Sequence, residues 1–238
     1  MMSLAHRLRA SRLYLCTDAR ERQGDLGDFL RAALAGGVDI VQVRQKNMAR
    51  DAELAALEIA RSAAVGSQAI VCVNDSPQLA HAFAADMLHL GQTDGSASRA
   101  RRSLHEWALV GRSTHTPEQA DDAAADPDVS YFAVGPVHAT PTKPDYVPVG
   151  LDLVRHAARV APVGDVGSKP WFAIGGLDAD NLDQVIEAGA RRVVVVRAVT
   201  EASDPEAAAR VLKNRLRQAW ADDPALASYA LRSAALDA

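Results

Sequence analysis

The sequence is poor in aromatic residues and lacks any long apolar run. Aromatic residues make up 5% of the 238 residues while 48% are hydrophobic, which predicts a core of Ala, Val, Leu and Ile. No run approaches the ~18 apolar residues of a membrane span, and residues 1–10 contain no stretch apolar enough for a signal peptide. A net charge of −4 gives no electrostatic reason to expect nucleic acid or a membrane surface as a partner.

Cysteine and lysine are also scarce. Cys16 and Cys72 both lie in apolar, strand-like runs, and two buried thiols without disulfide spacing predict a reducing compartment, hence a cytoplasmic protein. Only four lysines are present, and two of them, Lys46 and Lys143, follow apolar runs directly.

What the sequence does contain is a series of eight short apolar runs, most of which end in polar residues. The runs are RLYLCT, VDIVQV, AIVCV, DMLHL, WALVG, YFAVG, WFAIG and RVVVV. Runs that are apolar on both faces and alternate with amphipathic helices indicate a parallel sheet covered on its outside. Together with a length near 250 residues, the pattern predicts a single α/β domain, a (β/α)8 TIM barrel with its active site at the carboxyl ends of the strands.

The domain is expected to span residues 1–220, with a short N-terminal segment and a C-terminal extension, 221–238, to which the sequence assigns no role. Local signals place several helix ends. Gly36-Gly37 predicts a helix end, Asp51 a helix N-cap, and Ser76-Pro77 and Thr116-Pro117 predict helix starts.

Basic side chains follow two of the predicted strands. Alternate residues of an extended chain point to the same side, so Gln42, Arg44 and Lys46 can face one ligand together. Arginine and lysine suit phosphate oxygens. Solvated surface charge is the alternative, and Lys143 after another strand favours a binding site over it.

Two carboxylates, Asp75 and Asp94, follow the third and fourth runs. Each could cap a helix. With basic groups and an anion nearby, however, they resemble a Mg²⁺ site, because free carboxylates beside a pyrophosphate would repel it without a divalent cation between them.

Small and hydroxyl-bearing residues complete the strand ends. Gly175-Gly176 and the backbone around Val196-Arg197 match the phosphate-binding location of TIM barrels. Ser113, Thr140 and Thr142 could donate to a phosphate or a heteroaromatic ring, or could simply form turns.

A general base or nucleophile is harder to find. His89 and His115 have no carboxylate partner that the sequence can identify, so packed or surface positions are expected for both. Two anion sites without a nucleophile or base suggest a transfer in which pyrophosphate leaves and a second phosphorylated molecule attacks.

Residues 12–200 resemble the thiamine-phosphate synthase family. The matching segments are VQVRQK, VNDSPQLA, LHLGQTD, GRSTHT, YFAVGPVHATPTK, VPVGL and AIGGL. The resemblance implies joining of 4-amino-5-hydroxymethyl-2-methylpyrimidine diphosphate to a thiazole phosphate, with release of pyrophosphate by a dissociative mechanism. A homo-oligomer is compatible with the sequence, which does not define the oligomeric state.

The resemblance also implies roles for individual residues. Arg44, Lys46, Ser113 and Lys143 would be catalytic, and Asp75 and Asp94 would hold Mg²⁺. The substrate-binding set would be Gln42, Arg44, Gln45, Lys46, Asn74, Ser113, Thr140, Thr142, Lys143, Gly176, Val196 and Arg197. Arg197 departs from the family, which usually has a small residue there.

Two other functions remain open. A thiazole tautomerase, on a sister barrel, would use a base such as His115 and would not need Arg44, Lys46, Asp75 and Asp94 together. A phosphate-ligand sensor on a retained barrel would bind without turnover.

Overall fold

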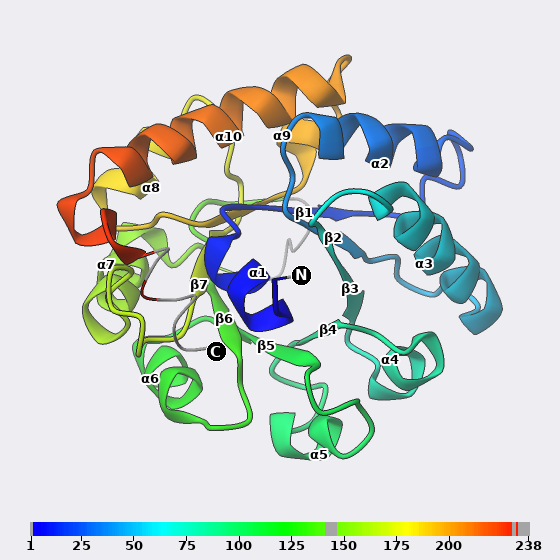
Figure 1. The fold of residues 1–238 in the computed structure, drawn as a ribbon, viewed down its shortest axis with the longest axis horizontal. Coiled ribbons are helices and arrows are strands. Elements are labelled where there is room, and N and C mark those ends of the chain that lie inside the picture. The colour runs from blue at the N-terminus through cyan, green and yellow to red at the C-terminus, as the bar shows by residue number, and fades with distance from the viewer. Residues whose placement is uncertain (1, 141–146, 230–231, 233–238) are drawn as a thin grey trace.

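The computed structural model describes residues 2–140, 147–229 and 232. Eight parallel strands pair in sequence order and close into one barrel (Figure 1). They are β1 (Leu13–Thr17), β2 (Ile40–Val43), β3 (Ile70–Asn74), β4 (Met87–Leu90), β5 (Leu109–Thr114), β6 (Tyr131–Val134), β7 (Trp171–Ile174) and β8 (Val193–Val195). The predicted (β/α)8 barrel is confirmed.

Helices surround the barrel in the order that the alternating pattern predicts (Figure 1). They are α1 (Leu4–Ala10), α2 (Leu26–Ala35), α3 (Arg50–Ala64), α4 (Pro77–Phe83), α5 (Ala97–Arg101), α6 (Pro117–Ala125), α7 (Gly150–Val160), α8 (Leu182–Glu187), α9 (Arg197–Thr200), α10 (Pro205–Ala221) and the 3-10 helix η1 (Pro224–Leu226). None in the described part of the chain is long and apolar enough to cross a membrane.

Three of the local helix signals are confirmed and one is wrong. Gly36 ends α2, and the Ser76 and Thr116 side chains accept hydrogen bonds from backbone N–H groups at the starts of α4 and α6. Asp51, however, does not cap α3, which begins at Arg50 after the N-cap Ala49. The carboxylate lies instead in the first turn, where it still favours the positive end of the helix.

Two layers of buried residues hold the fold together. Outward-facing strand residues such as Val41 and Leu88 pack against the helices in the main core. Inward-facing residues fill the barrel with a second cluster, in which Tyr14, Tyr131 and Phe172 make edge-to-face contacts with ring centroids 5.6 and 5.8 Å apart. Leu8 of α1 belongs to this cluster, so α1 closes the amino-terminal end of the barrel, where Figure 1 shows it across the centre.

The described part of the C-terminal extension packs on the barrel. Leu226 and Tyr229 are buried against Trp220 of α10. The ring of Trp220 also lies under the guanidinium groups of Arg12 and Arg192, at 4.2 and 5.0 Å from its centroid. The Tyr229 hydroxyl accepts a hydrogen bond from the Arg192 guanidinium at 3.2 Å, so the extension also contacts the residue that precedes β8. The domain boundary at residue 220 stays a prediction.

Gly111 of β5 makes room for Tyr131 inside the barrel. A Cβ at position 111 would lie 2.0 Å from Tyr131 Cζ, and the ring is fully buried. We therefore expect Gly111→Ala to lower the free energy of unfolding by about 1–3 kcal/mol, the usual cost of overpacking a core. Urea denaturation followed by circular dichroism measures the change.

Gly27→Ala is the matched control, because a Cβ there would meet only ordinary contacts, the nearest at 3.4 Å on the Arg31 side chain. In the helix α2 this change should be neutral or stabilising by up to ~1 kcal/mol. Equal unfolding midpoints for the two variants would contradict the packing role of Gly111.

Candidate active site

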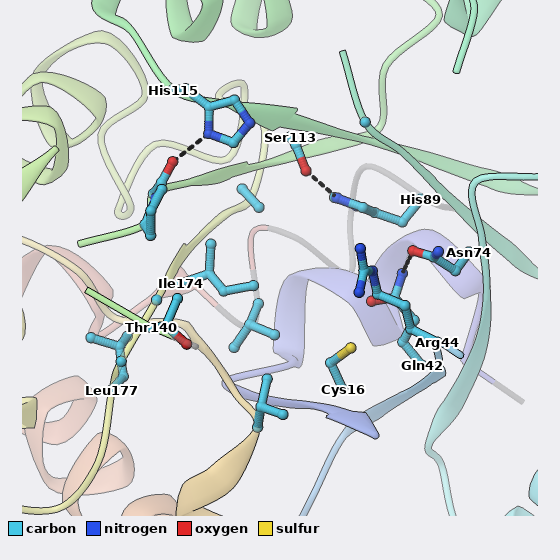
Figure 2. A pocket seen from close by; sticks show the side chains of 18 of the residues that line it. Cys16, Gln42, Arg44, Asn74, His89, Ser113, His115, Thr140, Ile174 and Leu177 are labelled. Atoms are coloured by element: carbon cyan, nitrogen blue, oxygen red, sulfur yellow. Dashed lines mark hydrogen bonds between the residues drawn. The ribbon is translucent and has the colours of Figure 1, made fainter. Parts of the chain in front are cut away.

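A cavity of about 470 Å³ opens at the carboxyl ends of the strands (Figure 2). Inward-facing residues from all eight strands or their ends form its wall and floor. They are Cys16, Gln42, Asn74, His89, Ser113, Ala133, Ile174 and Val194. Below them the larger inward residues Tyr14, Tyr131 and Phe172 fill the barrel, so the cavity ends on a packed floor.

The two predicted metal ligands lie next to each other. Burial raises the pKa of Asp75 to about 6, and the neighbouring Asp94 carboxylate contributes to the rise, while Arg44 opposes it. Asp75 has a left-handed backbone, with φ of 59°, and its N–H donates to the His89 carbonyl at 2.8 Å. Asp94 Oδ2 accepts from the Gly91 N–H at 2.7 Å, which holds the second carboxylate toward the first.

Arg44 and Lys46 line the same side of the cavity as this carboxylate pair. Arg44 is half-buried and Lys46 is exposed. The Arg44 N–H donates to the Thr17 carbonyl at 2.8 Å, which continues the β1–β2 pairing one residue past β2. The backbone that carries the two basic side chains is therefore fixed at the end of β2.

Amides and a hydroxyl lie between the charged groups and the floor. The Gln42 amide donates to Asn74 Oδ1 at 3.1 Å, so β2 and β3 present their polar residues together (Figure 2). Ser113 Oγ lies 2.9 Å from His89 Nε2, and the Ser113 carbonyl accepts from the Gln92 amide at 2.5 Å. This part of the cavity offers both donors and acceptors to a polar ring.

The opposite side, at β7 and β8, is built from backbone. Gly175 and Gly176 have φ of 113° and 64°, and a Cβ on Gly175 would lie 2.4 Å from Pro136 Cα. Glycine is required because the loop after β7 passes against the loop after β6. The Asn181 side chain fixes this turn: Nδ2 donates to the Gly176 carbonyl at 2.8 Å, and Oδ1 accepts from the Asp178 N–H at 3.1 Å.

The structure brings together almost all the predicted site residues that it describes. Those lining the cavity are Gln42, Arg44, Lys46, Asn74, Asp75, Asp94, Ser113, Thr140, Gly176, Val196 and Arg197. Thr142 and Lys143 lie outside the described residues. Arg197 begins α9, and its exposed guanidinium makes no hydrogen bond or ion pair with another described residue.

Gln45 does not line the cavity, and its contact with substrate stays a prediction. Its amide oxygen accepts from the Ala19 N–H at 3.0 Å, and its amide nitrogen donates to Glu21. Alternation along the extended chain explains this, because Gln45 points away from the side that Arg44 and Lys46 share. It ties the loop after β2 to the loop after β1.

Sequence reasoning also missed residues that belong to the cavity. His89 and His115 both line it, although packed or surface positions were expected. His115 Nδ1 lies 2.5 Å from the Gly135 carbonyl (Figure 2). Side-chain alternation in DMLHL could have shown that His89 faces the barrel interior, because it lies between Leu88 and Leu90, which face outward.

Comparisons with known proteins agree with this geometry. A family model described as thiamine monophosphate synthase matches residues 13–199. Curated thiamine-phosphate synthases from Thermobifida fusca and Streptomyces avermitilis are each 54% identical to 90% of the chain and are covered over 96% and 97% of their own lengths. A solved structure of thiamine phosphate pyrophosphorylase from Pyrococcus furiosus aligns with a TM-score of 0.77 at 26% identity, covering 91% of this chain and 99% of that one. This chain therefore belongs to the thiamine monophosphate synthase family.

Proposed function

We propose that the protein condenses 4-amino-5-hydroxymethyl-2-methylpyrimidine diphosphate with 4-methyl-5-(2-phosphoethyl)thiazole, giving thiamine phosphate and pyrophosphate. One observation supports the proposal: two sides of a single cavity differ in chemistry, and each is suited to an anion. Carboxylate and basic side chains lie at β2–β4, and a glycine-rich backbone segment lies at β7–β8. A volume of about 470 Å³ is within the range of small-molecule sites.

The β2–β4 side suits a diphosphate bound through a divalent cation. Two adjacent carboxylates, one with a raised pKa, repel each other, and a cation between them relieves that repulsion. Mg²⁺ uses one or two carboxylates and keeps other positions for water and substrate phosphate, so Asp75 and Asp94 fit it. Bound there, the ion would supply positive charge to the departing pyrophosphate.

Arg44 and Lys46 would add their own charge to the same phosphates. The arginine fork can bind two oxygens at once, and lysine supplies a mobile point charge. Lys143 belongs to this group by resemblance. Together these residues stabilise the negative charge that grows on pyrophosphate as the bond to the pyrimidine methylene breaks.

The polar wall between the two sides would hold the aminopyrimidine ring. Gln42 and Asn74 lie on the adjacent strands β2 and β3, Ser113 lies on β5, and all three line the cavity and can bind its nitrogens. The inward-facing Cys16, Ile174 and Val194 give the ring an apolar surface on which to lie. Held in this way, the ring places its methylene toward the second substrate.

The β7–β8 side would hold the phosphate of the thiazole. N–H groups of the Gly175–Gly176 turn and of Val196 and Arg197 are suited to an anion, and Asn181 keeps the turn in place. Thr140 lines the cavity, and Thr142 follows it two residues later in the sequence. The guanidinium of Arg197 would add a charge that a small residue would not.

The reaction then needs positioning and charge stabilisation more than acid–base chemistry. The carbon–oxygen bond breaks with its electron pair on pyrophosphate, and the lone pair of the thiazole nitrogen forms the new carbon–nitrogen bond. No proton moves in either step. Two ligands held in one cavity convert this capture into an intramolecular event.

The other candidate functions explain less of the site. A tautomerase could use His115, which lines the cavity, but would leave the carboxylate pair and Arg44 without a role. A sensor would bind both ligands without forming product.

The cytoplasm is the proposed location, supported by two buried free thiols.

Incubation of the purified protein with both substrates and Mg²⁺ tests the proposal directly. Thiamine phosphate and pyrophosphate should appear in equal amounts, as measured by chromatography and a pyrophosphate assay. Tight binding of both substrates without product would favour the sensor. Rearrangement of a thiazole phosphate alone, without pyrimidine diphosphate, would favour the tautomerase.

Asp94→Asn should lower Mg²⁺-dependent turnover by on the order of 10²-fold or more, because one ligand charge is lost where the transition state is stabilised. The asparagine oxygen can still accept from the Gly91 N–H, so the loop should keep its shape. Calorimetric titration should show nearly unchanged binding of the thiazole phosphate.

Asp86→Asn is the control for this change, since Asp86 directly precedes β4 at the far end of the barrel and does not line the cavity. It should keep the Mg²⁺ dependence of the unmodified protein. Full activity of Asp94→Asn would remove Asp94 from the metal site.

Arg197→Ser should raise the KM for the thiazole phosphate about 3- to 10-fold, because an exposed charge-assisted contact is lost. The KM for the pyrimidine diphosphate should change little. The effect should shrink as salt is added, since exposed charges are screened. Steady-state kinetics at two ionic strengths measure both quantities.

Arg197→Lys keeps a positive charge and should restore most of the affinity. An unchanged KM in Arg197→Ser at low salt would show that the guanidinium does not reach the phosphate.

A further inference from the structure

A chain of side-chain contacts runs from the middle of the barrel to the cavity wall. The Tyr14 and Tyr131 hydroxyls are 3.5 Å apart, and the Tyr131 hydroxyl lies 2.9 Å from His89 Nδ1. His89 Nε2 lies 2.9 Å from Ser113 Oγ, which lines the cavity (Figure 2). The imidazole therefore connects a buried phenol to a hydroxyl that can reach a ligand.

Both phenols keep their protons. Tyr14 and Tyr131 are fully buried in the barrel, and burial raises the pKa of each well above the usual value. A protonated phenol has one hydrogen to donate, and Tyr131 has a choice of neighbours. His89 Nδ1 is the best acceptor among them, because it is closer than the Tyr14 hydroxyl and the Cys72 sulfur, which lies 3.9 Å away.

The direction of this first hydrogen bond determines the rest. A phenol is a stronger donor than a neutral imidazole N–H, so Tyr131 donates and Nδ1 accepts. The proton of a neutral imidazole must then be on Nε2, since only one ring nitrogen carries it. Nε2–H donates to Ser113 Oγ, and the serine hydrogen is left to point away from His89, toward the cavity.

We propose that His89 is a positioning residue that, held in the Nε2–H tautomer by Tyr131, presents the Ser113 hydroxyl as a hydrogen-bond donor to a ring nitrogen of the pyrimidine substrate. The inference rests on the proposed function for the identity of that ring. Each hydrogen bond polarises the next, so the serine becomes a better donor than an isolated hydroxyl. A ring with an N–H donor at that position would point its hydrogen at the hydrogen of the Ser113 hydroxyl and would bind less well.

The packing around these hydrogen-bonded side chains holds them in one arrangement. Gly111 lies between the strand positions of His89 and Tyr131, paired with both across the sheet. Its missing side chain admits the Tyr131 ring, whose Cζ would be 2.0 Å from a Cβ there. The Ser113 backbone is fixed on its other side by the Gln92 amide, which donates to its carbonyl at 2.5 Å.

The tautomer can be observed without any substrate. In ¹⁵N-labelled protein at neutral pH, the two-bond ¹⁵N–¹H spectrum of His89 should show protonated Nε2 and unprotonated Nδ1. Signals absent from His89→Gln identify the residue. Tyr131→Phe should weaken the preference by removing the donor to Nδ1. An Nδ1–H tautomer or an imidazolium in the unmodified protein would overturn the proposal.

A pair of amide substitutions tests the consequence for binding. Glutamine at position 89 reaches as far as Nε2 and can still donate to Ser113, whereas the shorter asparagine reaches only the position of Nδ1. We expect His89→Asn to raise the KM for the pyrimidine diphosphate about 3- to 10-fold, the effect of one net hydrogen bond, with little change for the thiazole phosphate. His89→Gln should stay close to the unmodified protein.

Equal KM values for the two variants, or a rise shared by both substrates, would show that His89 acts only by packing. Thermal melts establish that both variants fold. If the unmodified protein makes no thiamine phosphate, the proposed function fails, while the NMR spectrum still decides the tautomer.

Discussion

Closure of eight parallel strands into one barrel is the constraint on which the site depends. Parallel pairing in sequence order puts every strand's carboxyl end on the same rim. Side-chain alternation then divides each strand between the helices and the barrel interior. Gln42, Asn74, His89 and Ser113 occupy the upper inward layer of four consecutive strands, so polar groups separated by up to about seventy residues meet without any loop having to carry them.

Electrostatics within this frame are unbalanced until ligands arrive. Burial, together with the neighbouring Asp94 carboxylate, raises the pKa of Asp75 to about 6, and Arg44 compensates only in part. Carboxylates at this position would repel an anion that bound without a cation. Under the proposed function, a divalent cation and a diphosphate would bind here together, each relieving the repulsion that the other would meet. The β7–β8 side would need no such partner, because its proposed donors are neutral backbone groups and the Arg197 guanidinium.

Much of this could be predicted from the sequence, for two physical reasons. Strands buried on both faces are apolar throughout, so runs such as AIVCV are visible one by one, and the residues that follow them must lie at the rim. What the sequence could not reveal depended on side-chain direction or tertiary contact. Gln45 is adjacent to two site residues yet faces the other way, and His89 looked isolated because its partners, Tyr131 and Ser113, come from other strands. Asn181 gave no signal at all, since its contact to the Gly176 carbonyl exists only in the folded turn.

The positions of the few aromatic residues explain how the floor of the cavity is formed. Three rings among the four tyrosines and four phenylalanines fill the lower barrel, where Tyr14 and Tyr131 each contact Phe172 edge to face. Gly111 admits the Tyr131 ring, and above the rings smaller inward residues such as Ala133 line the cavity. The same rings are more than filler, because the buried hydroxyl of Tyr131 reaches the polar wall through His89. Core packing and substrate recognition are therefore joined at one side chain, so a change that disturbs the floor must also change what the wall can bind.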